Sequence, residues 1–164
     1  MVTLRCTRKL LDRLPKSAAT CEPRSTTKLG DWYANVLNVG RLRLVLCVNE
    51  PSRLSVLVQA KDLARSPGEL ARAAREVLLG IGAPDHVVAE EIRQMAEVTL
   101  APTRSRSVLG SINDLGFMVR IHLRERPSVE LLDVSLRLAE VPCSPLGYAH
   151  PASVARDLLT ATRH

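Results

Sequence analysis

Four short stretches of the first 60 residues carry strand-like patterns of apolar and polar positions. Residues 2–6 alternate Val, Leu and Cys with Thr and Arg, and residues 41–49 place four apolar side chains on one face. Residues 31–39 and 54–60 lie on either side of the latter stretch, across turn-forming residues such as Gly40 and Pro51. We therefore expect residues 31–60 to form a three-stranded antiparallel meander, to which residues 2–6 can add a fourth strand.

The period of the pattern changes from Lys61 onward, where apolar residues recur at helical spacing. Ser66 and Pro67 are typical of a helix start, and Gly80 and Gly82 of a helix end. The pattern predicts about five helices in this part, over residues 66–82, 83–100, 107–123 and 127–141 and a last one from Pro151. Residues 101–106 read as a basic loop.

Strands and helices are thus segregated along the chain, which favours an α+β fold. We expect a small, mainly antiparallel sheet of three or four strands in the N-terminal third to half, with the C-terminal helices packed on one of its faces. At 164 residues the chain can bury a core of its own, so we predict a single domain over residues 1–164. Its residues 1–60 form a strand-rich basic part and its residues 61–164 a helical part.

The predicted helix over residues 107–123 is apolar on nearly every side, which is typical of a central, buried helix. Its main apolar stripe is Val108, Ile112, Leu115 and Val119. Glycine inside a helix costs about 1 kcal/mol relative to alanine, so we expect another part of the chain to approach Gly110 and Gly116 closely. An acidic group in such a helix, Asp114, would need a cation or several hydrogen-bond donors nearby.

The segment GDWYAN, residues 30–35, gathers donors and acceptors at the start of a predicted strand. We expect it to face the polar positions of the helix over residues 107–123 and to form either a structural polar network or a binding site. The candidate binding residues are Asp31, Trp32, Tyr33, Asn35, Arg43, Arg104, Arg106, Ser107, Ser111, Asn113 and Asp114.

The net charge of +6 is concentrated in residues 1–60, which hold ten Lys or Arg residues against four Asp or Glu residues. Arg41 and Arg43 lie on one predicted strand, and we expect Arg5 and Gln59 on its neighbours. A basic sheet surface favours a phosphate-bearing or acidic partner, such as nucleic acid or an acidic protein. No zinc-ligand spacing and no phosphate-binding glycine loop occurs, so the pattern indicates neither a metal nor a cofactor.

The N-terminal segment contains charges at Arg5, Arg8 and Lys9, so it lacks the apolar core of a signal peptide. No stretch approaches the about 18 apolar residues of a membrane span. These patterns predict a cytoplasmic protein that does not enter a membrane.

Several strings of the sequence are distinctive: LRCTRKLL, STTKLGDWYANVL, RLVLCVNE, RSVLGSIND and LAEVPCSPLGY. With them the chain resembles, from Leu4 to about Leu159, a family of small bacterial proteins classed as a domain of unknown function. The resemblance implies a stand-alone cytoplasmic domain and assigns no catalytic role to any residue.

Three functions remain open from the sequence. The first is a non-enzymatic binding domain for a phosphate-bearing or acidic partner. The second is a hydrolase or nuclease that uses Asp31, Asn113 and Asp114, with Arg104 or Arg106 on a phosphate. The third is a partner subunit of a paired bacterial system.

Overall fold

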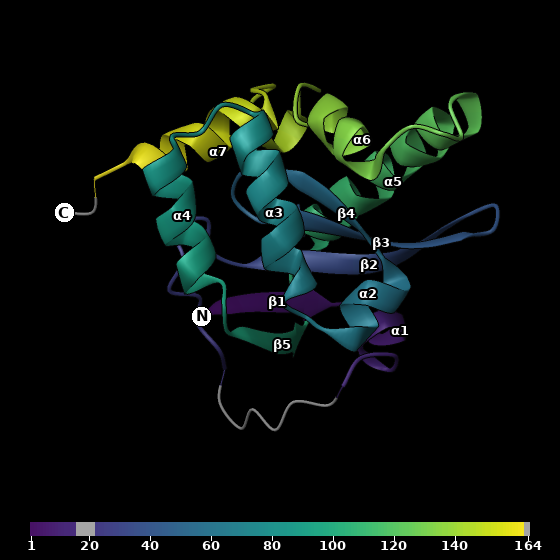
Figure 1. Ribbon diagram of the computed structural model, residues 1–164, viewed down its shortest axis with the longest axis horizontal. Coiled ribbons are helices and arrows are strands. Elements are labelled where there is room, and N and C mark those ends of the chain that lie inside the picture. The colour runs from purple at the N-terminus through teal and green to yellow at the C-terminus, as the bar shows by residue number, and fades with distance from the viewer. Residues whose placement is uncertain (16–21, 163–164) are drawn as a thin grey trace.

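In the part of the chain that the structure describes, five strands form one mixed sheet with the strand order β4-β3-β2-β1-β5 (Figure 1). The structure is a computed structural model that describes residues 1–15 and 22–162. The strands are β1 (Val2–Cys6), β2 (Trp32–Val39), β3 (Leu42–Asn49), β4 (Ser55–Gln59) and β5 (Val98–Pro102). Strand β3 pairs antiparallel with β2 on one side and with β4 on the other, so the predicted meander is confirmed.

The N-terminal strand β1 joins this meander in parallel with β2, with Leu4 opposite Trp32. On its other side β1 pairs in parallel with β5, from Val2 opposite Val98 to Cys6 opposite Pro102. The sheet is therefore mixed, and the expectation of three or four mainly antiparallel strands is only roughly right. Strand β5 was not predicted because its residues continue the apolar pattern of the preceding helix, which ends at Gln94.

Within residues 1–15 and 22–162, seven helices and one short 3₁₀ segment connect and cover the strands. They are α1 (Arg8–Leu11), α2 (Ala60–Arg65), α3 (Glu69–Gly80), α4 (Asp85–Gln94), α5 (Arg106–Glu125), α6 (Leu131–Leu138), η1 (Ser144–Leu146) and α7 (Pro151–Thr160). Helix α3 begins at Glu69, because Pro67 and Gly68 form a turn before it. The prediction of about five helices in the C-terminal part is only roughly right, since the described residues form six α-helices from residue 60 onward and α2 is the additional one.

The helices cover both faces of the sheet, which corrects the expectation of one covered face (Figure 1). On the first face, alternate strand residues such as Leu4 and Cys47 pack with helices α1, α2, α3, α4 and α7. On the second face, the intervening residues such as Tyr33 and Leu46 pack with α5 and α6. The alternation of side chains along each strand thus supplies two separate apolar cores.

Helix α5 packs on the second face through Val108, Ile112, Leu115 and Val119, as its apolar stripe predicted. Ser105 caps its N-terminus, where the Ser105 hydroxyl accepts a hydrogen bond from the backbone N–H of Val108. The helix is not buried all round, however: the Phe117 side chain is 64% exposed and Ile121 is 39% exposed. The wide apolar arc of this helix therefore includes an outer face that the described residues leave uncovered.

The two glycines of α5 differ in their surroundings. A Cβ atom at Gly116 would lie 3.4 Å from Leu37 Cδ1 of β2, so the predicted close approach is confirmed there. No other described part of the chain comes within 4 Å of a Cβ atom at Gly110, so the same expectation is wrong at that position. Gly116 sets the distance between α5 and β2, whereas Gly110 lies on the exposed side of the helix.

Candidate functional site

Strand β2 sends its two aromatic side chains to opposite faces of the sheet. Tyr33 lies in the core beneath α5, as expected for a residue facing that helix. Trp32 lies fully buried in the other core, and its indole Nε1 has no hydrogen-bond partner among the described residues. The expectation that Trp32 donates to polar groups of α5 is therefore wrong, because neighbouring residues of a strand cannot share a face.

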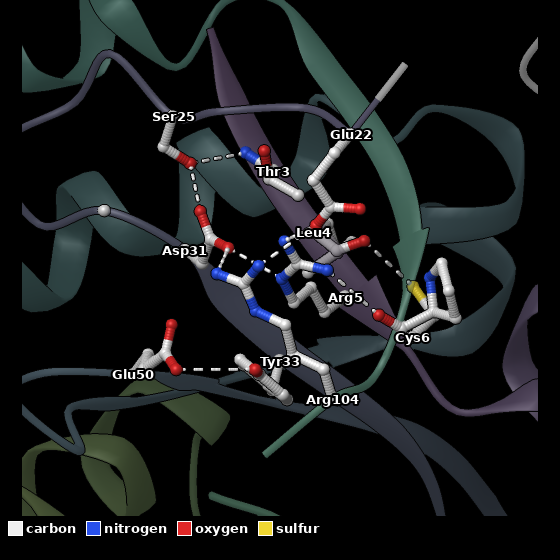
Figure 2. A network of polar contacts seen from close by, with 12 residues as sticks. Thr3, Leu4, Arg5, Cys6, Glu22, Ser25, Asp31, Tyr33, Glu50 and Arg104 are labelled. Carbon is white, nitrogen blue, oxygen red and sulfur yellow. Dashed lines mark hydrogen bonds and ion pairs between the residues drawn. The ribbon is translucent and has the colours of Figure 1, made fainter. Parts of the chain in front are cut away.

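Asp31, just before β2, forms a buried ion pair with Arg5 of β1 (Figure 2). Arg5 Nε donates to Asp31 Oδ2 at 2.7 Å, and Ser25 Oγ donates to Asp31 Oδ1 at 2.7 Å. Arg5 Nη2 donates to Glu22 Oε1 at 2.6 Å, and Nη1 donates to the Pro102 carbonyl at 3.2 Å. Each nitrogen of this guanidinium thus donates to an acceptor in the fold.

Arg104 adds a second cation to the same group of side chains (Figure 2). Its Nη1 donates to Glu22 Oε1 at 3.0 Å, and its Nη2 lies 3.7 Å from Asp31 Oδ2. We call Arg5, Glu22, Asp31 and Arg104 the Arg5 cluster. Two cations face two carboxylates in it, so the cluster leaves no excess charge for a ligand.

The pKa values reflect this compensation. Burial acts to lower the pKa of Arg5, but hydrogen bonds to Glu22 and Asp31 outweigh it and raise that pKa above its ordinary value. The hydrogen bond from Arg5 in turn holds the pKa of Glu22 below its ordinary value. Next to the cluster, burial first and then the Glu50 carboxylate raise the pKa of Tyr33, whose hydroxyl donates to Glu50 Oε1 at 3.4 Å.

Asn35 is half-buried and contacts the chain after β1 instead of α5. Its Oδ1 accepts a hydrogen bond from Thr7 Oγ1 at 2.7 Å and another from the backbone N–H of Val36. The amide therefore links β2 to the segment that leads into α1. It makes no contact with the polar residues of α5 in the part of the chain that the structure describes.

The serines of α5 have a partner that the sequence pattern did not indicate. Arg53 Nη2 donates to Ser107 Oγ at 2.9 Å, and Arg53 Nε donates to Ser111 Oγ at 3.1 Å. Arg53 is only 8% exposed, and burial lowers the pKa of its guanidinium. It forms no ion pair with a carboxylate within residues 1–15 and 22–162, although the charge of Glu50 acts against the lowering of this pKa.

A tight turn between β3 and β4 directs Arg53 toward α5. Asn49 Oδ1 accepts hydrogen bonds from the Ser52 backbone N–H and from Ser52 Oγ, and the Arg53 N–H donates to the Asn49 carbonyl. Arg53 adopts a φ of +58°, a conformation that only glycine adopts without strain. A turn was expected here, but no residue pattern specifies a left-handed arginine.

The remaining polar candidates of α5 lie at its surface. Asn113, Asp114 and Arg106 are exposed, so the expectation of a buried Asp114 is wrong. No hydrogen bond or ion pair among the described residues joins Asp31 to Asn113 or Asp114. The hydrolase hypothesis needs these groups to converge in one cleft, whereas Asp31 is buried in the Arg5 cluster and the other two face outward.

Arg43 lies in a second and different setting, a groove beside the β2–β3 hairpin. One chamber of this groove has a volume of about 450 Å³ and an adjoining chamber has a volume of about 460 Å³. Arg13, Arg41 and Arg43 line both chambers, and Lys61 lines the first. We call the two chambers together the basic groove.

The basic groove is formed by three elements that Figure 1 shows at one end of the sheet. The β2–β3 hairpin turns at Gly40, with a φ of +56°, and supplies Arg41 and Arg43. Arg13 follows α1, and Lys61 lies in α2. The apolar floor of the first chamber consists of Leu10, Leu14, Val36, Leu42, Ala60 and Ala64.

No acidic side chain balances the cations of the basic groove. All 17 Asp and Glu residues lie in the described part of the chain, and none lines either chamber. None of the four cations forms an ion pair with one of these carboxylates. The groove therefore carries an uncompensated positive charge, in contrast to the Arg5 cluster.

The sequence pattern indicated part of this surface. It placed Arg41 and Arg43 on a basic strand with Gln59 nearby, and Gln59 lines the groove opposite Leu44. It also placed Arg5 there, which is wrong because Arg5 is 1% exposed and paired in the Arg5 cluster. Arg13 and Lys61 were missed, since only the packing of α1 and α2 brings them to the strand.

The model of one protein family, described as "Domain of unknown function (DUF6933)", matches residues 3–154. The chain belongs to this family, and the resemblance to a domain of unknown function is thereby confirmed. No curated protein and no solved structure matches the chain. The family description assigns no activity, so the function has to be argued from the geometry above.

Two further observations concern membranes and metals. None of the helices in the described ranges has the length and apolar character needed to cross a bilayer. Within those ranges there is also no group of three or more His, Cys, Asp or Glu side chains that could hold a metal ion. The buried thiol of Cys6 has a pKa raised by burial to about 12, so it is not an activated nucleophile.

Proposed function

We propose that the protein is a non-enzymatic binding protein that holds a phosphate-bearing partner in the basic groove. The observation that supports this proposal is the set of four cations, Arg13, Arg41, Arg43 and Lys61, that line one groove without a carboxylate partner. Arginine donors form strong, charge-assisted hydrogen bonds with phosphate oxygens. A phosphate group would supply the negative charge that the fold itself does not.

The placement of the cations adds to this argument. Like charges that converge on one groove repel each other, and a bound anion relieves that repulsion. The cations also lie on three separate elements, so their approach depends on the tertiary fold and not on a run of basic residues in the sequence. The turn at Gly40 and the packed helices α1 and α2 fix the backbone positions of these residues before any ligand arrives, which reduces the ordering cost of binding.

Binding of pyrophosphate by isothermal titration calorimetry tests the proposal. We expect wild-type protein to bind it and the double variant Arg41→Gln/Arg43→Gln to bind it at least about tenfold more weakly. The reason is that a hydrogen bond to a charged group contributes about 1.5–3 kcal/mol, and 1.4 kcal/mol corresponds to a factor of ten in affinity.

The double variant Arg75→Gln/Arg124→Gln is the matched control, since it removes the same charge from exposed arginines outside the groove. It should bind pyrophosphate as the wild type does. Equal affinity of the groove variant and the wild type, or no binding by the wild type at low salt, would contradict the proposal. The partner-subunit hypothesis stays a prediction that this experiment does not address.

A further inference from the structure

The two chambers of the basic groove differ in chemistry, although they share three arginines. The first chamber has an aliphatic floor formed by Leu10, Leu14, Val36, Leu42, Ala60 and Ala64. Among the residues that the structure describes, the second chamber is lined by Arg13, Asn38, Gly40, Arg41 and Arg43, and none of these five is apolar apart from the glycine. A ligand that fills both would need an apolar part joined to an anionic part.

The aliphatic floor belongs to the core on the first face of the sheet. Leu10 and Leu14 are buried members of that core, and Val36, Ala60 and Ala64 pack against it. The core thus opens into the groove at this end, where it presents methyl and methylene groups to the ligand. An inorganic phosphate or a sugar–phosphate backbone would leave these groups in contact with water, whereas an aliphatic group would cover them.

The aromatic side chains of the protein argue against single-stranded nucleic acid as the ligand. Proteins that bind single strands stack bases on aromatic rings above a basic groove. Trp32 and Tyr33 are fully buried in the two cores, and neither Phe117 nor Tyr148 lines the groove. A nucleic-acid strand would therefore find phosphate-binding cations here but no surface for its bases.

From these observations we infer that the groove binds an aliphatic phosphate monoester, with the phosphate among Arg13, Arg41 and Arg43 and the hydrocarbon group on the floor of the first chamber. This inference rests on the proposed function and specifies its ligand. The same chemistry occurs in a soluble phosphorylated compound and in the headgroup region of an anionic lipid. The experiment separates these two sources.

The test compares hexyl phosphate, inorganic phosphate, 1-hexanol and a single-stranded oligo(dT) as ligands of the full chain in calorimetry. Hexyl phosphate should bind at least about tenfold more tightly than inorganic phosphate, because burial of about two methylene groups is enough for that factor. Hexanol should bind more weakly than hexyl phosphate. Sedimentation with phosphatidylcholine vesicles that contain phosphatidic acid provides the lipid arm, and binding in either arm supports the inference.

Two variants separate the two chambers. Ala64→Phe fills part of the apolar chamber and should abolish the advantage of hexyl phosphate while inorganic phosphate still binds. Arg41→Gln/Arg43→Gln should weaken both ligands. Circular dichroism and the unfolding midpoint of each variant establish that it is folded, and Ala64→Met is a second, smaller filling in case the phenylalanine disturbs α2.

The inference and the proposed function fail in different ways. If inorganic phosphate binds through Arg41 and Arg43 but hexyl phosphate binds no more tightly, the proposed function stands and the aliphatic ligand is overturned. If oligo(dT) binds more tightly than hexyl phosphate, nucleic acid replaces the aliphatic ligand. If no phosphate compound binds wild-type protein, both proposals are overturned.

Discussion

Arginine side chains are paired with carboxylates in one region of this molecule and unpaired with carboxylates in another. In the Arg5 cluster, Arg5 is 1% exposed and donates to Asp31, Glu22 and the Pro102 carbonyl. In the basic groove, Arg13, Arg41 and Arg43 are exposed and converge without a carboxylate. The first region uses arginine to join β1, β5 and the chain before β2, and the second region leaves its donors open to a ligand.

The difference shows that the number of basic residues near a sheet does not locate a binding surface. Both regions come from the basic N-terminal part of the sequence, yet only one keeps its positive charge after folding. Whether a basic residue keeps its positive charge uncompensated depends on whether a carboxylate lies close enough to pair with it. Asp31 and Glu22 pair with Arg5, whereas none of the described Asp and Glu side chains lines the basic groove. The following predictions test this contrast, from the largest expected effect to the smallest.

Removal of the Asp31 carboxylate from the Arg5 cluster should have the largest effect on the free energy of unfolding. Asp31→Ala leaves a buried guanidinium with one partner fewer and should lower the free energy of unfolding by about 3 kcal/mol, the lower end of the range for a broken buried ion pair. Urea denaturation measures this change. The matched control is Glu76→Ala, which removes an exposed partner of Arg72 and should cost at most about 0.5 kcal/mol. Equal losses in the two variants would contradict a structural role for the Arg5 cluster.

Arg53 lies between the two extremes, because it is buried but bonded to hydroxyls instead of carboxylates. Arg53→Ala and Arg53→Gly both remove its hydrogen bonds to Ser107 and Ser111. Only glycine removes the strain of the left-handed backbone conformation, so Arg53→Gly should be more stable than Arg53→Ala by about 1 kcal/mol. Thermal unfolding of the two variants side by side measures the difference. If the alanine variant is the more stable one, the strained turn is not present in solution.

The Arg5 cluster should also make stability depend on acid pH. The pKa of Glu22 is depressed in the folded state by the hydrogen bond from Arg5. Its contribution is therefore fully present above its unfolded pKa, near 4.3, and is lost as pH falls through the lower folded value. Urea midpoints between pH 7 and pH 3 should fall less steeply for Glu22→Gln than for wild type. The variant Arg41→Gln/Arg43→Gln should follow the wild-type profile, and parallel profiles for all three proteins would disprove the linkage.

Removal of charge from the groove should have the smallest effect on stability. Arg41→Gln/Arg43→Gln breaks no ion pair among the described residues, so the free energy of unfolding should change by less than about 0.5 kcal/mol per substitution. Chemical denaturation at low salt provides the measurement. A loss comparable with that of Asp31→Ala would mean that these arginines have structural partners, and the contrast between the two regions would disappear.

The sequence predicted the local features well and the pairing of distant ones poorly. The β2–β3–β4 meander and the core stripe of α5 follow from short-range periodicity, which is why both were predicted correctly. Strand β5 was missed because it is a parallel edge strand of five residues, directly after a helix with a similar apolar content. The prediction that helices cover only one face of the sheet was wrong for a related reason. Some strands carry apolar residues on both faces, but the prediction assigned only one buried face to each strand.

The candidate site was predicted in part for the same reason. Arg43 and its strand were identified from charge and alternation, whereas Arg13 and Lys61 join it only through the packing of α1 and α2. Asp31 and Arg104 do lie together, but the cation that donates a hydrogen bond to Asp31 is Arg5, 26 residues earlier in the sequence. Ser107 and Ser111 were identified as a polar pair, and their partner Arg53 depends on a backbone conformation that its neighbours do not encode.

Strand β1 pairs with two strands that both come later in the chain. Strand β2 is the next strand in the sequence, whereas β5 lies almost a hundred residues later, with Val98 opposite Val2. Pairs so distant in sequence close slowly during folding. Until β5 is synthesised and docks, one border of β1 presents unpaired N–H and C=O groups, which are a template for unwanted strand addition. Fragments that stop before residue 98 should therefore associate with one another, while the 164-residue chain covers this border of β1 with its own strand β5.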